Sequence, residues 1–185
     1  MPGTLGHSDS WWKTGSPLSA FLAGEGLELV PADCWSTALV LSPYLQDDWK
    51  VGAAPLIDMV RDWPQDEVRI VAHSHGGQVV FEAAARGLKI DKLITIGTPV
   101  RSDEVRTIRR GLPNIGRWHH VCDLTFDKWA ILGTLFSGWA VLRRTFRLAH
   151  QNVRIPKIDH ARMLNDPSRF VLWREDGLID FLRSE

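Results

Sequence analysis

The chain of 185 residues has little cysteine and no excess of charge of either sign. Its two cysteines, Cys34 and Cys122, are lone thiols without C-x-x-C spacing, so the sequence gives neither a disulfide framework nor a zinc-finger pattern. The 22 basic residues balance the 22 acidic ones, so we expect no broad electrostatic affinity for nucleic acid. The sequence also lacks the H-E-x-x-H spacing of metalloproteases, and we predict neither a metal nor another cofactor.

Long apolar runs are missing as well. The segment Met1-Pro2-Gly3-Thr4 has neither the basic nor the apolar part of a signal peptide, so we expect a cytoplasmic protein. Residues 132–144 are apolar with a basic end, but they are too short to cross a bilayer. They could form a lid or touch a lipid interface, although a buried hairpin or helix is the preferred interpretation.

The length and composition predict one globular domain over residues 1–185, with 44% hydrophobic and 24% charged residues. Apolar runs typical of strands alternate with stretches of helical periodicity. The expected strands are 26–30, 68–72, 92–96 and 118–122, and the expected helices are 17–24, 50–63, 75–86 and 102–110, with further helices beginning near Asp166 and Asp176. This alternation predicts an α/β fold with a mainly parallel sheet and helices on both faces.

The most informative residues are His73-Ser74-His75-Gly76-Gly77, which stand between an apolar run and a helical stretch. A strand, a serine and a helix in this order form a nucleophile elbow, whose tight turn needs small residues two positions before and after the serine. Ala72 and Gly76 meet this need, although glycine is commoner at the first position. The alternative is a simple turn with a solvated serine. The context favours Ser74 as a nucleophile, with a helix start directed at the space where an oxyanion would form.

A serine hydroxyl needs a histidine to take its proton and a carboxylate to orient that histidine. In enzymes built around such an elbow, the acid and then the histidine follow the serine along the chain. After the strand that ends near Cys122 the candidates are Asp127 and Asp123. Asp127 is favoured because it stands further out on the loop, whereas Asp123 could be needed for the turn itself. Asp103 and Asp159 are the next alternatives.

Two histidines follow these acids, His150 and His160. His150 is expected on a helix or hairpin. His160 stands at a junction between a loop and the C-terminal helical region, which is where the base belongs. We therefore predict His160 as the general base.

Four stretches give the chain a resemblance to bacterial or phage-type α/β-hydrolases of the lipase or esterase kind. They are Gly3-Thr4 with Trp11-Trp12, residues 72–76, residues 93–99, and His160 with its flanks. The resemblance implies an oxyanion hole made by the backbone N–H groups of His75 and of Thr4 or Leu5. It also implies that Gly97-Thr98-Pro99 ends a strand beside the active site. The strand that precedes the Gly-Thr loop in such proteins has no counterpart here, so either the native start lies upstream or the domain is N-terminally shortened.

Aromatic and metal-binding residue types leave two further interpretations. Trp11 and Trp12 stand near the expected oxyanion loop and are predicted to contact an acyl group, while most of the nine tryptophans are read as core or subsite walls. His119, His120, Cys122 and Asp123 are close in sequence, but their spacing matches no known metal motif.

The predicted function is a serine hydrolase that cleaves small carboxylic esters through an acyl-enzyme on Ser74, His160 and Asp127. Two alternatives stay open. One is a non-catalytic member of the same fold that binds a partner, and the other is a thioesterase or amidase with the same triad. The sequence predicts no oligomeric state.

Overall fold

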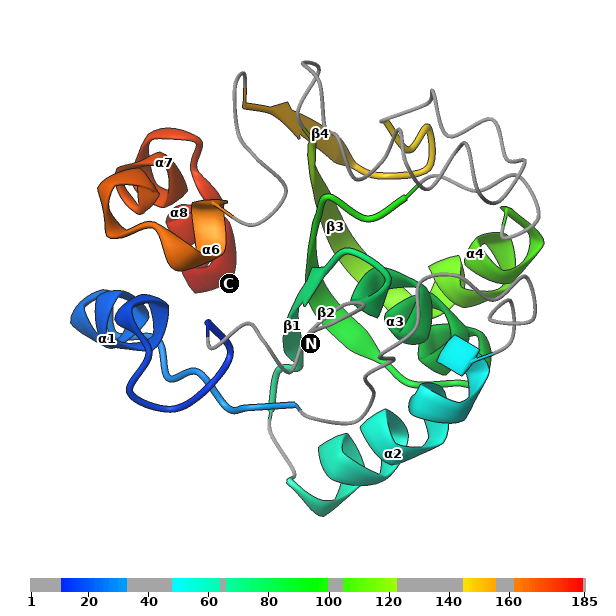
Figure 1. The fold of residues 1–185 in the computed structure, drawn as a ribbon. Coiled ribbons are helices and arrows are strands. Elements are labelled where there is room, and N and C mark those ends of the chain that lie inside the picture. Colours follow the sequence, from blue (N-terminus) through cyan, green and yellow to red (C-terminus); the bar gives the residue numbers. More distant parts are fainter. Residues whose placement is uncertain are drawn as a thin grey trace.

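The computed structural model describes residues 11–32, 48–63, 66–99, 105–122, 145–155 and 162–184. Four strands in these ranges form a parallel sheet in the order β1-β2-β3-β4 (Figure 1). The strands are β1 (Arg69–His73), β2 (Ile90–Ile96), β3 (Ile115–Cys122) and β4 (Gln151–Arg154). Because every pair is parallel, the carboxyl ends of all four strands lie at one edge of the sheet.

Helices cover both faces of this sheet (Figure 1). On one face lie α2 (Asp48–Asp62), α3 (Gly76–Ala85) and α4 (Val105–Gly111), followed by the short 3-10 helix η2 (Leu112–Asn114). On the other lie α1 (Pro17–Gly24), α6 (Arg162–Asn165), α7 (Val171–Glu175) and α8 (Leu178–Arg183), with the 3-10 helix η3 (Pro167–Arg169) between α6 and α7. The predicted α/β class, a parallel sheet between two helical layers, is confirmed.

Each face of the sheet carries its own apolar core, because successive side chains of a strand point to opposite faces. Leu93 and Ile94 of β2 are both fully buried and belong to different cores. Leu93 packs with Phe81 of α3 and Trp118 of β3, whose rings meet at a centroid distance of 4.8 Å. Ile94 belongs to the core that includes Trp173 of α7. A strand buried on both faces in this way is typical of a parallel sheet.

The helix α1 spans Pro17–Gly24, as predicted. The Ser16 hydroxyl accepts a hydrogen bond from the Ser19 N–H at 3.0 Å, and Pro17 occupies the first helical position, where its missing N–H costs nothing.

The predicted strand 26–30 is wrong. Gly26 turns the chain with φ +72°, and residues 27–32 have no regular secondary structure and pair with none of the described strands. Alternating apolar residues do not make a strand without a neighbour to pair with.

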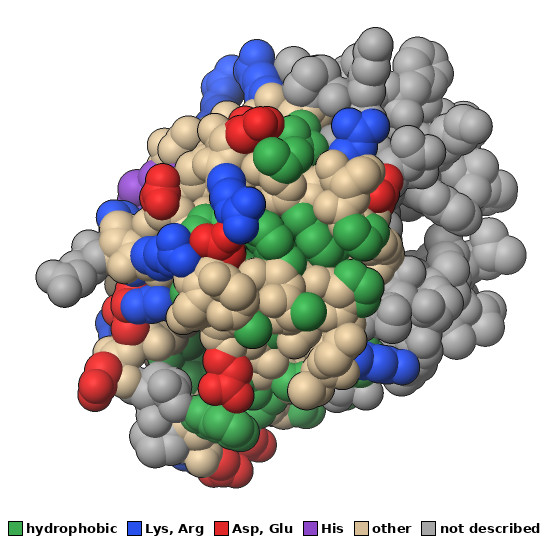
Figure 2. Space-filling view, turned by 90° about the vertical axis from the view of Figure 1, so that its left-hand side faces the viewer, with side chains coloured by type: hydrophobic (Ala, Val, Ile, Leu, Met, Phe, Trp, Pro, Cys, Tyr) green, Lys and Arg blue, Asp and Glu red, His purple; other side chains and the backbone are tan. Residues whose placement is uncertain are grey.

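The layer of α1, α6, α7 and α8 is held together by a buried carboxylate. Glu25, at the end of α1, accepts a hydrogen bond from Arg174 Nε at 2.6 Å and pairs with Arg183 Nη2 at 2.9 Å. The Arg183 Nε also donates to the Glu25 carbonyl at 2.8 Å. Figure 2 shows the outer face of this layer, where side chains of both charges surround apolar surface.

A buried lysine ties this layer to the sheet. Lys92 of β2 is 1% exposed, and its Nζ lies 2.6 Å from Glu67 Oε1 and 3.3 Å from the Leu182 carbonyl oxygen. It also donates to the carbonyl of Ser184, whose Oγ accepts from Arg117 Nη2 at 2.7 Å. Cations next to the last carbonyls of a helix satisfy groups that lack partners within it, so the sheet anchors the end of α8.

Glu67 is held in its charged form at this anchor. The hydrogen bond from Arg69 is the main reason that the pKa of Glu67 lies below its usual value, and the bond from Lys92 acts in the same direction. Burial opposes both effects but does not cancel them.

His119 of β3 makes the same face sensitive to acid. Its ring stacks on Phe181 of α8 at a centroid distance of 3.8 Å. Burial is the main cause that lowers the pKa of His119 below 6.5, and Arg117 and His150 lower it further. The unfolded chain therefore binds a proton more readily than the folded one, so this contribution to stability is full above pH 6.5 and is lost as the pH falls through the folded pKa.

We expect the free energy of unfolding, measured with urea, to be smaller at about pH 5 than at about pH 7.5. The variant His119→Phe keeps an aromatic ring against Phe181 but cannot titrate, so it should show a weaker dependence on pH than the wild type. An equal dependence in both proteins would mean that other groups cause it.

Within the described ranges, no helix combines the length and the apolar character needed to span a membrane.

Candidate active site

Ser74 lies in the turn between β1 and α3, at the carboxyl edge of the sheet. Its φ is +52°, and among the described residues it is the only one other than glycine with a positive φ. This left-handed conformation costs a residue with a Cβ about 1–3 kcal/mol and persists only where the surroundings impose it. A serine held in this way between a strand and a helix has the backbone geometry that the nucleophile elbow requires.

Backbone hydrogen bonds fix the turn on both sides. The Ser74 N–H donates to the Ile96 carbonyl of β2 at 2.9 Å, and the Ser74 carbonyl accepts from the Gly77 N–H at 3.1 Å. The next carbonyl, that of His75, accepts from the Gln78 N–H at 3.0 Å. The serine is therefore tied to the neighbouring strand through its N–H and to the start of α3 through its carbonyl.

Close packing around the turn explains its small residues. Ala72 is fully buried, as expected for the small position before the serine. A Cβ on Gly77 would overlap the side chain of Thr98, which packs against the first turn of α3. The sequence pattern pointed to Gly76 as the small residue after the serine. The contact that demands glycine at position 77 comes from a residue after the next strand, and the pattern around Ser74 could not reveal it.

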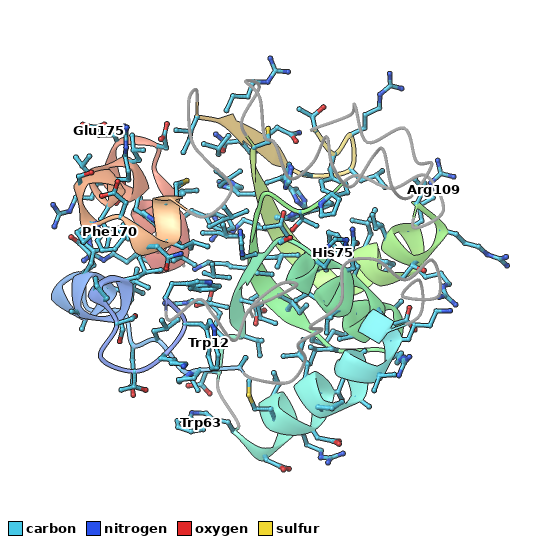
Figure 3. All side chains as sticks on the ribbon, viewed as in Figure 1. Trp12, Trp63, His75, Arg109, Phe170 and Glu175 are labelled. Carbon is cyan, nitrogen blue, oxygen red and sulfur yellow. The ribbon has the colours of Figure 1, made fainter. Side chains whose placement is uncertain are left out.

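The two histidines that flank the serine differ in their surroundings. His73 is 4% exposed, and the Trp11 ring meets it edge-on at a centroid distance of 6.2 Å. His75 is half-buried and immediately precedes α3. In Figure 3, Trp12 lies on the α1 side of the sheet and His75 on the α3 side. Of the two, only His75 is partly exposed.

Trp11 and Trp12, predicted to contact an acyl group, are 1% and 6% exposed. Both belong to the core between the sheet and α1, α6, α7 and α8. The Trp11 carbonyl accepts a hydrogen bond from the Ser16 hydroxyl at 2.6 Å, which joins this segment to the start of α1. Their burial gives them a packing role, and contact with a substrate stays a prediction.

The other predicted site residues lie outside the described residues. They are the acid Asp127 with its alternatives Asp123, Asp103 and Asp159, the base His160, and the oxyanion donors Thr4 and Leu5. The structure does describe the strands that precede Asp123, Asp127 and His160 in the chain. β3 ends at Cys122, directly before Asp123, and β4 ends at Arg154, a few residues before His160. Both strand ends lie at the same edge of the sheet as Ser74, because the sheet is parallel.

The side chains of His119, His120 and His150 make contacts within the fold. His120 Nδ1 lies 2.8 Å from the Thr95 hydroxyl, in the core below α3, whereas His119 stacks on Phe181 across the sheet. His150 Nδ1 accepts from the Trp118 N–H at 3.0 Å, at the start of the pairing between β3 and β4. His119 and His120 therefore point away from each other, and no group of three potential metal ligands occurs in the part of the chain that the structure describes.

An open hollow of about 520 Å³ lies elsewhere on the surface. It is lined by residues of α1, by residues 26–31, by Thr14 and by the half-exposed indole of Trp63. Ser74 does not line it, so the geometry gives this hollow no part in chemistry at the elbow.

No family model matches the chain, and no curated protein matches it. A solved structure described as a predicted CIB-like hydrolase from Thermoplasma acidophilum is similar, with 12% sequence identity and a TM-score of 0.48. The similarity covers 78% of this chain and 66% of that one, so the chain spans just under two thirds of that protein's length. At this identity and score the similarity says nothing about the reaction.

Proposed function

We propose that the protein is a serine hydrolase that cleaves carboxylic esters through an acyl-enzyme formed on Ser74. The observation that carries the proposal is the left-handed backbone of Ser74 between β1 and α3. Glycine would adopt this conformation without strain, so a serine here carries a conformational cost that a function of its side chain would explain. The parallel sheet also places the turn at the edge where active sites of open α/β sheets form.

In the proposed reaction His160 takes the proton of the Ser74 hydroxyl as Oγ attacks the ester carbonyl carbon. The tetrahedral intermediate collapses, the alcohol leaves with the proton from His160, and the acyl group stays on Oγ. Water then attacks the acyl-enzyme in the same manner and releases the acid. Asp127 orients His160 and stabilises the imidazolium. The support is the chain order, since Asp127 follows β3 and His160 follows β4.

The oxyanion of the intermediate would be bound by the backbone N–H of His75 and by that of Thr4 or Leu5. His75 directly precedes the first residue of α3, a helix of ten residues. The amino end of such a helix carries a partial positive charge, which favours a developing oxyanion. The second donor comes from the resemblance of the Gly3-Thr4 stretch to the oxyanion loop of α/β-hydrolases.

The leaving group can be identified by comparing substrates that carry the same acyl chain on different leaving groups. We propose that the substrates are short or medium acyl esters. p-Nitrophenyl esters, thioesters and anilides, compared with one another at each of several acyl lengths, separate an esterase from a thioesterase and an amidase. The proposal is supported if kcat/KM is higher for the esters than for the thioesters and the anilides. Failure to hydrolyse any of them would favour a binding protein of the same fold.

The acid of the triad is tested by two amide replacements. A triad carboxylate acts by fixing the tautomer of the histidine, so its amide variant should fold normally yet lose about four orders of magnitude in kcat. We expect Asp127→Asn to keep its melting temperature while losing most of its esterase activity.

Asp123→Asn is the matched control and should keep its activity. The reverse result would assign the role to Asp123. If both variants are active, the acid lies elsewhere, and Asp103 and Asp159 are tested next.

A further inference from the structure

We propose that Gln78 is a positioning residue that holds the elbow in its strained form through a hydrogen bond to the carbonyl of Pro99. Gln78 does not itself react. Its effect on rate rests on the proposed hydrolase function, whereas its effect on the backbone of Ser74 can be measured without it.

The contact joins the first turn of α3 to the segment that follows β2. Gln78 is 2% exposed, and its Nε2 donates to the Pro99 carbonyl oxygen at 2.8 Å. A carbonyl can only accept, so this bond fixes which end of the amide faces Pro99. The other end, Oε1, is buried without a hydrogen-bond partner among the described residues.

Burying the Gln78 Oε1 without a hydrogen-bond partner among the described residues lowers the stability of the fold. A residue that served only to pack would not bring this cost. A methionine would fill a similar volume without burying a polar atom that lacks a partner. Among the described contacts, the bond to Pro99 is the one that offsets the cost of burying this amide. The geometry assigns the side chain to that bond.

Residues 96–99, here called the brace, touch the elbow at three successive points. The Ile96 carbonyl accepts from the Ser74 N–H, the Thr98 side chain packs against Gly77, and the Pro99 carbonyl accepts from Gln78. The brace is itself fixed to the sheet, because the N–H of Gly97 donates to the Val121 carbonyl of β3 at 3.0 Å. The third contact closes a rigid path from β3 to α3 around the serine.

The strain at Ser74 makes this closure matter. A residue at φ +52° relaxes when its surroundings no longer impose that angle. Relaxation would turn the Cα–Cβ bond and move Oγ away from the point of attack. A shift of about 1 Å in a reacting group can cost about a hundredfold in rate. Loss of the bond should thus lower kcat more than it changes KM.

The test uses amide hydrogen exchange, which needs no substrate. In Gln78→Met the protection of the Ser74 and Gly77 amides should fall about fivefold, the effect of losing one hydrogen bond, while amides in β3 keep their protection. Gln151→Met is the matched control, because Gln151 is an exposed glutamine at the start of β4. It should leave the exchange at Ser74 and Gly77 unchanged.

The kinetic arm uses the same variants. We expect kcat for ester hydrolysis to fall about tenfold to a hundredfold in Gln78→Met with KM little changed, and both to be unchanged in Gln151→Met. If the wild type hydrolyses no ester, the proposed function fails, and the exchange result still decides the role of Gln78. Wild-type protection at Ser74 and Gly77 in a folded Gln78→Met would overturn the positioning role.

Gln78→Glu decides the question if the methionine variant does not fold. A protonated carboxyl can donate to the Pro99 carbonyl, and a carboxylate cannot. Protection at Ser74 should therefore match the wild type at about pH 5 and fall below it at about pH 9, once the buried acid has ionised. A ratio to wild-type protection that stays the same at both pH values would contradict the proposal.

Discussion

Ser74→Ala is expected to lower kcat/KM for p-nitrophenyl esters by about a thousandfold or more. The variant removes the only atom that forms the acyl-enzyme, so what remains is the catalysis that binding and oxyanion stabilisation provide. Serine and alanine both carry a Cβ, so the strain at φ +52° is the same in the two proteins. The melting temperature should therefore stay close to that of the wild type, which separates lost chemistry from lost structure.

The matched control for this experiment is Ser168→Ala. Ser168 is an exposed serine in η3, where its hydroxyl bonds only the nearby Asp166 among the described residues. Its replacement should leave kcat/KM unchanged. Ester hydrolysis by Ser74→Ala at the wild-type rate would show that Ser74 is not the nucleophile.

Lys92→Met is expected to lower the free energy of unfolding by about 3 kcal/mol, because two carbonyls at the end of α8 lose a buried charged donor and Glu67 keeps only Arg69 of its two cationic partners. Glu67 and the Leu182 carbonyl both lose their contact with Nζ, and the anchor between β2 and the end of α8 is broken. For a chain of this size the melting temperature should fall by roughly 6–12 °C. Thermal and urea unfolding measure both quantities.

Lys89→Met is the control for this loss of charge. Lys89 lies three residues earlier and is exposed, so its replacement should change the free energy of unfolding by less than about 0.5 kcal/mol. A Lys92→Met variant as stable as Lys89→Met would mean that Lys92 does not help to hold α8.

The parts of the fold that the sequence predicted correctly are those with a local cause. Ser16 and Pro17 mark the start of α1 through a side-chain cap and a fixed φ. The elbow strand and α3 were predicted within a residue or two, because an apolar run, small residues and a helical stretch meet there. Each of these signals acts within a few positions of the chain.

The parts that were missed depend on partners far along the chain. β4 is only four residues long and buries little besides Val153, and it exists because β3 pairs with it. Lys92 reads as a surface lysine in sequence, yet its partners Leu182 and Ser184 bury it. The strand expected at 26–30 failed for the opposite reason, since none of the described strands pairs with it.

The candidate site divides in the same way. Ser74 and His75 could be predicted from the elbow pattern, because tight turns restrict residue types locally. The roles of Gln78 and Thr98 could not be predicted from that pattern, because each contact joins the start of α3 to the segment after β2. Gln78 bonds Pro99, and Thr98 packs against Gly77. The acid and the base are predicted from chain order, and the roles of His160 and of Asp127 or Asp123 stay predictions.

Labelling with a fluorophosphonate probe tests the central claim most directly, because such a probe reacts with a serine only when its hydroxyl is activated. The adduct is located by mass spectrometry of the digested protein. We predict one adduct on the peptide that contains Ser74, and none on Ser74→Ala. The claim is contradicted if the folded protein stays unlabelled while a known serine hydrolase in the same tube reacts, or if the adduct lies on another residue.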